Sequence, residues 1–349
     1  MHMFFVKGVF NISAYLTFNA IKTDGVTDIY ERLMEYVALW KLPQKLGSCT
    51  SLAKIFSKKR EAACHAAKAF KCQASEGVSV IPIIAYCLQK VIMRAGIAVS
   101  ACAAFVALAD LVDTVSLAYS GSTTAEFLRF KVNTFLDACV AAGWEPYMTP
   151  KFHWPIHLPK QLEQWRFLLS CYVHERKHRM VKRYSTSISN TARNEWSVLS
   201  EVTCHHLATL RTTKSFDSRV GLLPPMRSAP QKLHRFCMQQ TGVDAPCTTA
   251  RSARINELHV CHTRDVVLVK TGDGEMNAAQ VWFHAEMQGQ AFSLVAVWEL
   301  LRDEGELCAK VWRTSNDRLT LCLLGDIVAP CTYKLQGRVA ITLDLPTAR

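Results

Sequence analysis

One stretch of 34 residues, 151–184, is denser than any other in side chains capable of chemistry. It reads KFHWPIHLPKQLEQWRFLLSCYVHERKHRMVKRY. It holds two His-x-x-x-His pairs, His153 with His157 and His174 with His178. Two imidazoles at this spacing on one helix can bind the same zinc ion. The pattern leaves two interpretations open. The four histidines converge on a structural zinc, or they make local hydrogen bonds that tie a loop to its neighbouring helices.

The second pair is part of a His-Glu-x-x-His pattern at residues 174–178. In zinc proteases the glutamate of this motif activates a zinc-bound water, so Glu175 is a candidate catalytic residue. The motif usually lies on a buried helix, which Arg176 and Lys177 do not favour. On an exposed helix, Glu175 would instead pair with Arg179 at i+4 and contribute a few tenths of a kcal/mol. A zinc-dependent hydrolase is therefore an alternative rather than the first hypothesis.

Five cations follow the glutamate within about two helical turns. They are Arg176, Lys177, Arg179, Lys182 and Arg183. Cations spaced in this way can contact successive phosphates, and each contact releases counterions. Such contacts position a protein on DNA without reading its bases. The run predicts a nucleic-acid-binding element, and the alternative is a solvated helix face.

The composition agrees with a nucleic-acid partner. The chain of 349 residues carries a net charge of +12, which raises its affinity for polyanions. Its 14 cysteines include no Cys-x-x-Cys pair, so an intracellular protein with free thiols is expected. The longest uncharged run, residues 95–109, is shorter than the roughly 20 residues that span a bilayer. We therefore expect a buried helix there and no membrane partner.

The first part of the chain has helical periodicity. Residues 27–140 predict several helices, one of them capped by Ser122 or Thr123 and ended by Gly143. Three prolines then predict a loop over residues 151–159. A long helix is expected from Lys160 into the basic run. A further helix is expected over residues 194–212, with these side chains facing inward: Trp196, Leu199, Val202, His206 and Leu210.

The last part of the chain has the period of β-strands. Residues 213–258 predict a linker with at most one short helix near 232–240. Five or six short antiparallel strands follow, which is typical of a small SH3-like barrel. The predicted class is thus α+β, with a helical region at 1–212, a linker at 213–258 and a β-barrel at 259–349. A barrel that binds a protein partner, with the helical region as a scaffold, is a second alternative function.

The segments KFHWPIHLP (151–159), CYVHERKHR (171–179) and KRY (182–184) resemble the transposase-associated region of CACTA-like transposable elements. The resemblance covers about residues 75–210. It implies a nuclear, DNA-associated protein, and it implies that a full transposase would hold two divalent metals such as Mg²⁺ with three carboxylates. Glu175 is the one residue that carries over, as the third carboxylate. The resemblance therefore implies the C-terminal part of a transposase without independent catalysis.

Overall fold

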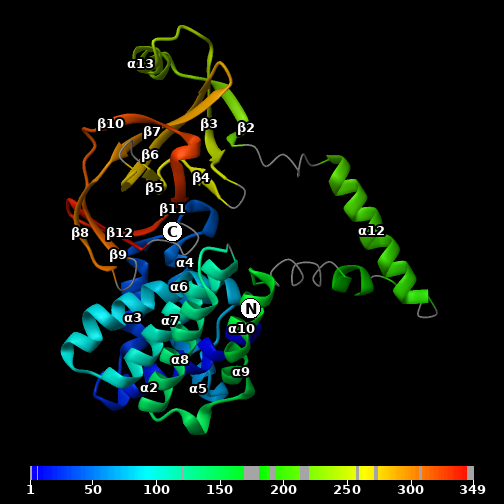
Figure 1. Cartoon of the computed structure of the whole chain (residues 1–349), viewed down its shortest axis with the longest axis vertical. Coiled ribbons are helices and arrows are strands. Elements are labelled where there is room, and N and C mark those ends of the chain that lie inside the picture. The colour runs from blue at the N-terminus through cyan, green and yellow to red at the C-terminus, as the bar shows by residue number, and fades with distance from the viewer. Residues whose placement is uncertain are drawn as a thin grey trace. The chain divides into compact units, whose positions relative to one another are not determined.

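The computed structural model describes residues 2–5, 7–119, 121–168, 181–186, 188, 193–212, 220–256, 259–270, 274–305 and 309–343. The chain divides into two units. The larger unit comprises His2–Leu168 together with Val220–Arg349, and the smaller one comprises Leu169–Arg219. Helices α1 to α10, blue to green in Figure 1, belong to the larger unit, as do the strands that are coloured from green to red.

The helical part of the larger unit is built from short and medium helices. They are α1 (His2–Phe5), α2 (Val9–Thr23), α3 (Ile29–Ala38), η1 (Gln44–Leu46), α4 (Cys49–Ala53), η2 (Lys54–Phe56), α5 (Lys58–Ala67), α6 (Ala74–Cys87), the π-helical η3 (Leu88–Ile92), η4 (Met93–Ala95), α7 (Val99–Tyr119), α8 (Ala125–Ala141), η5 (Glu145–Tyr147), α9 (Pro150–His153), η6 (Trp154–His157) and α10 (Leu158–Trp165). The predicted helical character of residues 27–140 is confirmed.

Helix α7 is the centre of this part, because it packs against α2, α6 and α8. Beside it lies a cluster of buried aromatic rings with neighbouring centroids 5.3 to 6.4 Å apart. Its members are Phe10, Phe18, Tyr30, Phe56, Phe70 and Phe105. Four of these ring pairs meet edge to face, an arrangement that is favourable in addition to their burial. Buried Asn11 donates its side-chain amide to the carbonyl of Phe70 at 2.8 Å, which fixes the loop that carries Phe70.

Two details of the predicted helices are corrected. The cap of α8 is Thr124, whose hydroxyl accepts the N–H of Phe127 at 3.1 Å, so the predicted cap was one or two residues early. The long helix expected from Lys160 is α10, which ends at Trp165. It ends there because Arg166 adopts a left-handed backbone, with φ +63°, and donates its N–H to Leu162 at 2.8 Å.

The proline-containing segment is helical rather than a loop. Pro150 lies at the start of α9, Pro155 at the start of η6 and Pro159 near the start of α10. A proline in the first turn of a helix removes no hydrogen bond, because the N–H groups there have no intrahelical partner. The prolines were expected to break helices and form a loop. They instead lie at the starts of three short helices.

Three helical stretches are long and apolar enough to cross a membrane by length and composition: Met3–Thr23, Ala74–Ala95 and Val99–Ala118. Residues 99–109 of the uncharged run that predicted a buried helix belong to the third stretch, and residues 96–98 form the turn before it. In the structure between half and two thirds of each stretch is buried against the rest of the protein. Phe105 and Leu108 of α7, for example, are fully buried.

The strands form two antiparallel sheets. They are β1 (Trp40–Lys41), β2 (Gly221–Ser228), β3 (Cys247–Arg254), β4 (Val260–His262), β5 (Val266–Lys270), β6 (Met276–Met287), β7 (Gln290–Val297), β8 (Glu299–Asp303), β9 (Ala309–Arg313), β10 (Leu319–Leu323), β11 (Ile327–Pro330), β12 (Thr332–Gln336) and β13 (Val339–Leu343), with η9 (Leu324–Asp326) before β11. One sheet has the order β1-β12-β13-β9-β8. The other follows β10-β7-β6-β3-β2, with β5 also on β6, β11 on β5 and β4 on β3.

The prediction of antiparallel strands in this region is confirmed, whereas no closed barrel is found among the described strands. A barrel closes when its first and last strands pair. Here the path of the larger sheet ends at β10 and β2, and the smaller sheet ends at β1 and β8. The strands are divided between two sheets, one of which takes its edge strand β1 from the helical part of the chain.

The region predicted as a linker contains the expected helix, α13 (Gln231–Thr241), and also two strands, β2 and β3. Pro224 and Pro225 made a strand unfavourable in the sequence. Strand β2 lies at the edge of its sheet, where a proline can be accommodated because its missing N–H need not join a ladder. Both prolines fall where the β2–β3 register shifts, between Leu223 and Met226.

The helical part and the sheets of the larger unit are joined by backbone and side-chain contacts. Strand β1 pairs with β12. The buried carboxylate of Asp265 accepts the backbone N–H of Gln44 at 3.0 Å and that of His262 at 2.8 Å. Glu304, at the end of β8, accepts from Lys90 at 3.1 Å and from the hydroxyl of Tyr86 at 3.2 Å.

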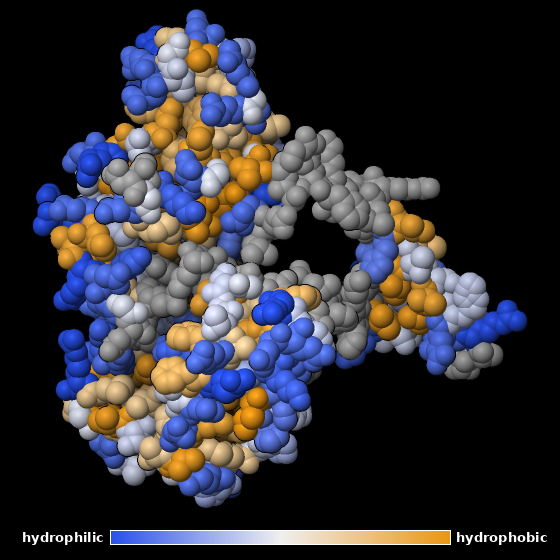
Figure 2. All heavy atoms as spheres, viewed as in Figure 1, coloured by the Kyte–Doolittle hydropathy of each residue, from blue (hydrophilic) through white to orange (hydrophobic). Residues whose placement is uncertain are grey.

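The smaller unit contains α12 (Asn194–Thr212) and a helical turn at residues 181–186. The bounds of α12 agree with the prediction. Two of the residues predicted to face inward do not, because Trp196 and Leu199 are 61% and 64% exposed. Val202 and His206 are half-buried, and the side chain of Leu210 lies outside the described residues. Figure 2 shows hydrophobic residues on the visible surface of α12. The periodicity identified the helix correctly, but it could not show that this part of its apolar side is uncovered.

Candidate nucleic-acid interface

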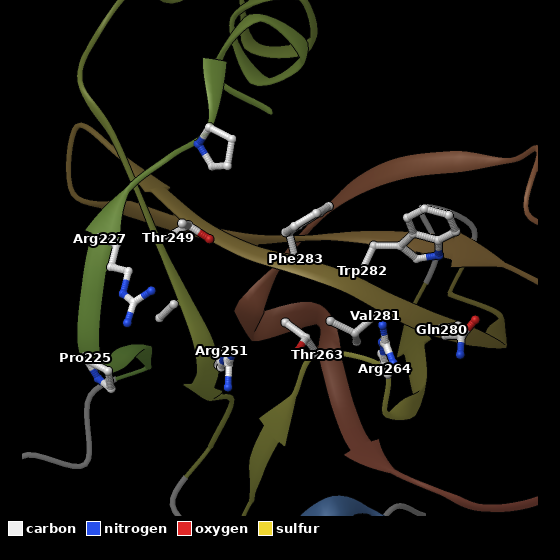
Figure 3. A pocket seen from close by; sticks show the side chains of 12 residues that line it. Pro225, Arg227, Thr249, Arg251, Thr263, Arg264, Gln280, Val281, Trp282 and Phe283 are labelled. Carbon is white, nitrogen blue, oxygen red and sulfur yellow. The ribbon is translucent and has the colours of Figure 1, made fainter. Parts of the chain in front are cut away.

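A groove of about 810 Å³ lies over strands β2, β3 and β6 and the turn between β4 and β5 (Figure 3). Its lining combines cationic, aromatic and small polar side chains. The residues are Pro225, Arg227, Pro230, Thr249, Ala250, Arg251, Thr263, Arg264, Gln280, Val281, Trp282 and Phe283.

Cross-strand register places part of this lining on one face of the sheet. Arg227 pairs with Thr249, and Thr249 pairs with Ala285, so the three side chains project to the same side. Ala285 lies beneath α13, in a buried cluster with Leu233 and Cys237 of that helix. Helix α13 therefore covers one part of this face, and the groove is a part that it leaves open.

The two aromatic residues of the groove owe their position to a β-bulge. The β6–β7 register pairs Val281 with Val295 and Phe283 with Leu294, which leaves Trp282 as an extra residue. In a regular strand two neighbours point to opposite faces, whereas a bulge redirects one of them. Trp282 and Phe283 are 39% and 37% exposed. Figure 3 shows both rings on one side of β6.

The turn at Thr263 and Arg264 is held against the bulged strand. Arg264 donates its backbone N–H to the carbonyl of Val281 at 2.6 Å, and Val281 donates to the carbonyl of Asp265 at 2.9 Å. Arg264 has φ +75°, a left-handed conformation that is uncommon for a residue with a side chain. These bonds hold the turn that carries Arg264 against Val281, next to the bulge in β6.

The groove is strongly cationic. Arg227, Arg251 and Arg264 are exposed and come from β2, β3 and the β4–β5 turn. Among the described residues, none that lines the groove is acidic, and none forms an ion pair with these three guanidinium groups. Pro230, the N-cap of α13, also lines the groove, and the first turn of α13 has no acidic residue. The partial positive charge of that helix end adds to the field of the arginines.

Behind the groove, a neutral histidine supports the sheet. His284 is fully buried, and its ring Nδ1 lies 2.7 Å from the hydroxyl of Ser293 on β7. Burial lowers the pKa of His284 to about 4, so the ring is uncharged at neutral pH. The carbonyl of His284 accepts the hydroxyl of Thr249, a lining residue, at 2.6 Å. Side-chain bonds therefore fix β3 and β7 against β6 at the position of the bulge.

This combination of groups is suited to a flexible polyanion. Guanidinium groups bind phosphate oxygens in a bidentate way. Exposed aromatic rings stack with nucleobases, and the groove is lined by both kinds of side chain. Among the described residues that line the groove, the charged ones are arginines and the others are aromatic, apolar or small and polar.

The predicted site at residues 174–183 lies largely outside the described part of the chain. Glu175, Arg176, Lys177 and Arg179 lie outside it, as do His174 and His178. Lys182 and Arg183 are described, on the helical turn 181–186, and both are exposed. They have the exposure that phosphate contact requires, and the predicted basic element stays a prediction.

His153 and His157, the first predicted pair, are brought together. Their Nε2 atoms lie 3.0 Å apart. Among the described residues, no group of three or more His, Cys, Asp or Glu side chains is arranged to hold a metal. Two members of the predicted site of four histidines are therefore seen side by side, and the other two lie outside the described residues.

Sequence reasoning missed the groove because its residues are dispersed. The three arginines are 24 and 13 positions apart and have no local pattern, and Trp282 was assigned to an ordinary strand. The one local signal was the adjacent pair Trp282–Phe283, since two consecutive large aromatic residues do not fit strict alternation.

Comparison with family models, curated proteins and solved structures finds no match to this chain. The resemblance to CACTA-like elements consequently stays a prediction from residues 75–210. The groove is interpreted from its own geometry and charge.

Proposed function

We propose that this protein binds single-stranded nucleic acid in the groove formed by β2, β3 and β6. The observation that carries the proposal is the convergence of three exposed arginines, from three separate segments, on a groove with two exposed aromatic rings. Phosphates would contact Arg227, Arg251 and Arg264, and bases would stack on Trp282 and Phe283.

The aromatic rings favour a single strand over a duplex. In a duplex the bases stack on each other, and a protein reaches mainly their edges and the phosphates. Exposed rings in a cationic groove contribute most to the binding free energy when bases are free to stack on them, at about 1–3 kcal/mol per base. The net charge of +12 supports the same partner class.

The sequence resemblance makes DNA the nucleic acid that we propose, in a nuclear, transposon-derived protein. The exposed Lys182 and Arg183 of the smaller unit would add phosphate contacts of the kind predicted for the basic run. These contacts do not require stacking, so they would serve duplex and single strand alike.

The proposal is tested by fluorescence anisotropy of labelled oligonucleotides over a salt series. An oligo-dT of about 20 nucleotides, an oligo-U of equal length and a duplex of equal length are compared. We expect the single strands to bind more tightly than the duplex, with affinity that falls steeply as salt increases. Tighter oligo-dT than oligo-U binding would support the DNA assignment, and the reverse would move the assignment to RNA.

A competition experiment distinguishes a nucleic-acid ligand of the groove from an acidic protein ligand. Poly-glutamate of matched charge should displace the single strand poorly, because it has no bases to stack. Equal displacement by poly-glutamate, or binding that is unchanged when Trp282 is replaced by alanine, would contradict the proposal. The first result would assign the groove to an acidic peptide.

A further inference from the structure

The two imidazoles of His153 and His157 face each other on the surface of the larger unit. Their Nε2 atoms are 3.0 Å apart, and their ring centroids are 4.8 Å apart with the planes at 74°. His153 ends α9 and His157 ends η6, and both side chains are exposed. This pair lies outside the groove, so a role for it is independent of nucleic-acid binding there.

We propose that His153 and His157 together bind one divalent transition-metal ion through their Nε2 atoms. Metal–imidazole bonds of about 2.0–2.1 Å place two ligand nitrogens about 2.9 Å apart at a 90° angle and about 3.3 Å apart at a tetrahedral angle. The observed 3.0 Å is between these values. Two imidazole nitrogens in cis positions on tetragonal Cu²⁺ or Ni²⁺ fit the observed separation directly. Tetrahedral Zn²⁺ needs the two Nε2 atoms about 0.3 Å farther apart.

The backbone holds the two histidines in position before any metal binds. Buried Phe152 stacks on buried Phe135, with ring centroids 6.0 Å apart and planes at 18°. Pro155, between the two histidines, is also buried and has a fixed φ. Phe152 and Pro155 thus anchor the segment inward, while His153 and His157 project outward. The backbone between the two ligands therefore has little conformational entropy left to lose on chelation.

The described part of the chain supplies two imidazole ligands to this site. Among the described residues no third His, Cys, Asp or Glu completes a metal-binding group. Neutral imidazoles suit Cu²⁺, Ni²⁺ and Zn²⁺ rather than Mg²⁺ or Ca²⁺, which prefer oxygen ligands. We therefore expect affinity in the order Cu²⁺ above Ni²⁺ and Zn²⁺, and no binding of Mg²⁺ at this position.

The test is titration of the full chain with Ni²⁺ and Zn²⁺ by isothermal calorimetry. The double variant His153→Gln/His157→Gln should lose one metal equivalent per chain. Each single variant should weaken that site by on the order of tenfold or more, because the second ligand then no longer binds intramolecularly. His205→Gln, a change at an exposed histidine of α12, is the matched control and should leave the site unchanged.

A second measurement uses tryptophan fluorescence to detect metal bound next to His153. Trp154 follows His153 directly and is 46% exposed, so bound Cu²⁺ should quench its fluorescence. The quenching that distinguishes the wild type from Trp154→Phe should require more Cu²⁺ in His153→Gln and in His157→Gln, and it should disappear in the double variant. Equal metal stoichiometry in the wild type and the double variant, or Trp154 quenching that is unchanged in the double variant, would overturn the proposal.

Discussion

Trp282 and Phe283 are consecutive residues of β6, yet both side chains are exposed and line the same groove. The bulge that inserts Trp282 into the β6–β7 ladder accounts for this arrangement. Without it, one of the two rings would turn to the buried face that contains Val281 and Val295. The aromatic surface of the groove thus depends on one extra residue in one strand.

Replacement of Trp282 by alanine should weaken binding of single-stranded DNA by about 5- to 150-fold, the equivalent of about 1–3 kcal/mol for one stacked base. Trp282→Phe should keep most of the affinity, since it keeps an aromatic face. Anisotropy titrations with oligo-dT measure both. Trp165→Ala is the control, because Trp165 is similarly exposed, at 44%, but lies on α10.

Replacement of Arg251 by alanine should reduce the salt dependence of binding. Each phosphate contact on a single strand contributes about 0.7 to the slope of log affinity against log salt. We expect the slope to become shallower by about that amount, and by about twice that amount in Arg227→Ala/Arg251→Ala. Arg338→Ala, at an exposed arginine outside the groove, should leave the slope unchanged. An unchanged slope in the double variant would show that these arginines do not contact phosphate.

Replacement of Asp265 by alanine should destabilise the larger unit. The change leaves the backbone N–H groups of Gln44 and His262 without their acceptor, at a cost of about 1–3 kcal/mol for each unsatisfied donor. Urea unfolding should show a lower midpoint. Asp317→Ala, at an exposed aspartate, should change the free energy of unfolding by less than about 0.5 kcal/mol. Equal midpoints for the two variants would contradict the role assigned to Asp265.

The buried His284 should make the protein less stable at acidic pH. Its pKa is about 4 in the folded protein and about 6.5 in an unfolded chain, so between these values the unfolded state binds a proton that the folded state does not. The stability contributed by the neutral ring is complete above about pH 6.5 and is lost as pH falls toward about 4. The wild type should lose about 1.4 kcal/mol per pH unit more than His284→Gln in this window. Parallel pH profiles of unfolding would contradict this.

The secondary structure was predictable where periodicity was strong and local. Helix α12 has the predicted bounds, and the strands after residue 258 follow the runs with a period of two. Burial was less predictable. The spacing of Trp196 and Leu199 is that of a packed face, yet periodicity cannot tell whether another element covers that face. The end of α10 was missed for a similar reason, because a left-handed Arg166 has no composition signal.

The groove could not be predicted because it depends on tertiary register. Arg227 and Thr249 share a face only once β2 and β3 pair in the observed register, and the prolines of β2 had argued against a strand there. The position of Trp282 depends on a bulge, for which the adjacent Trp282–Phe283 pair was the one local signal. The spacing of His153 and His157 was visible in the sequence, but their segment was predicted as a loop. Their side chains meet because α9 and η6 make the segment helical, so that residues at i and i+4 lie on one side of it.

The pairing of β1 with β12 has a consequence for synthesis. Trp40 is registered with Lys334, and Lys41 with Tyr333, so the edge strand and its partner lie near opposite ends of the chain. At about 5–20 residues per second, the ribosome would complete β12 roughly 15–60 s after β1. Throughout that interval β1 has no β12 to pair with, so its backbone N–H and C=O groups lack their partner strand. Folding yield should therefore depend on the speed of translation and on the chaperones that bind the chain during the wait.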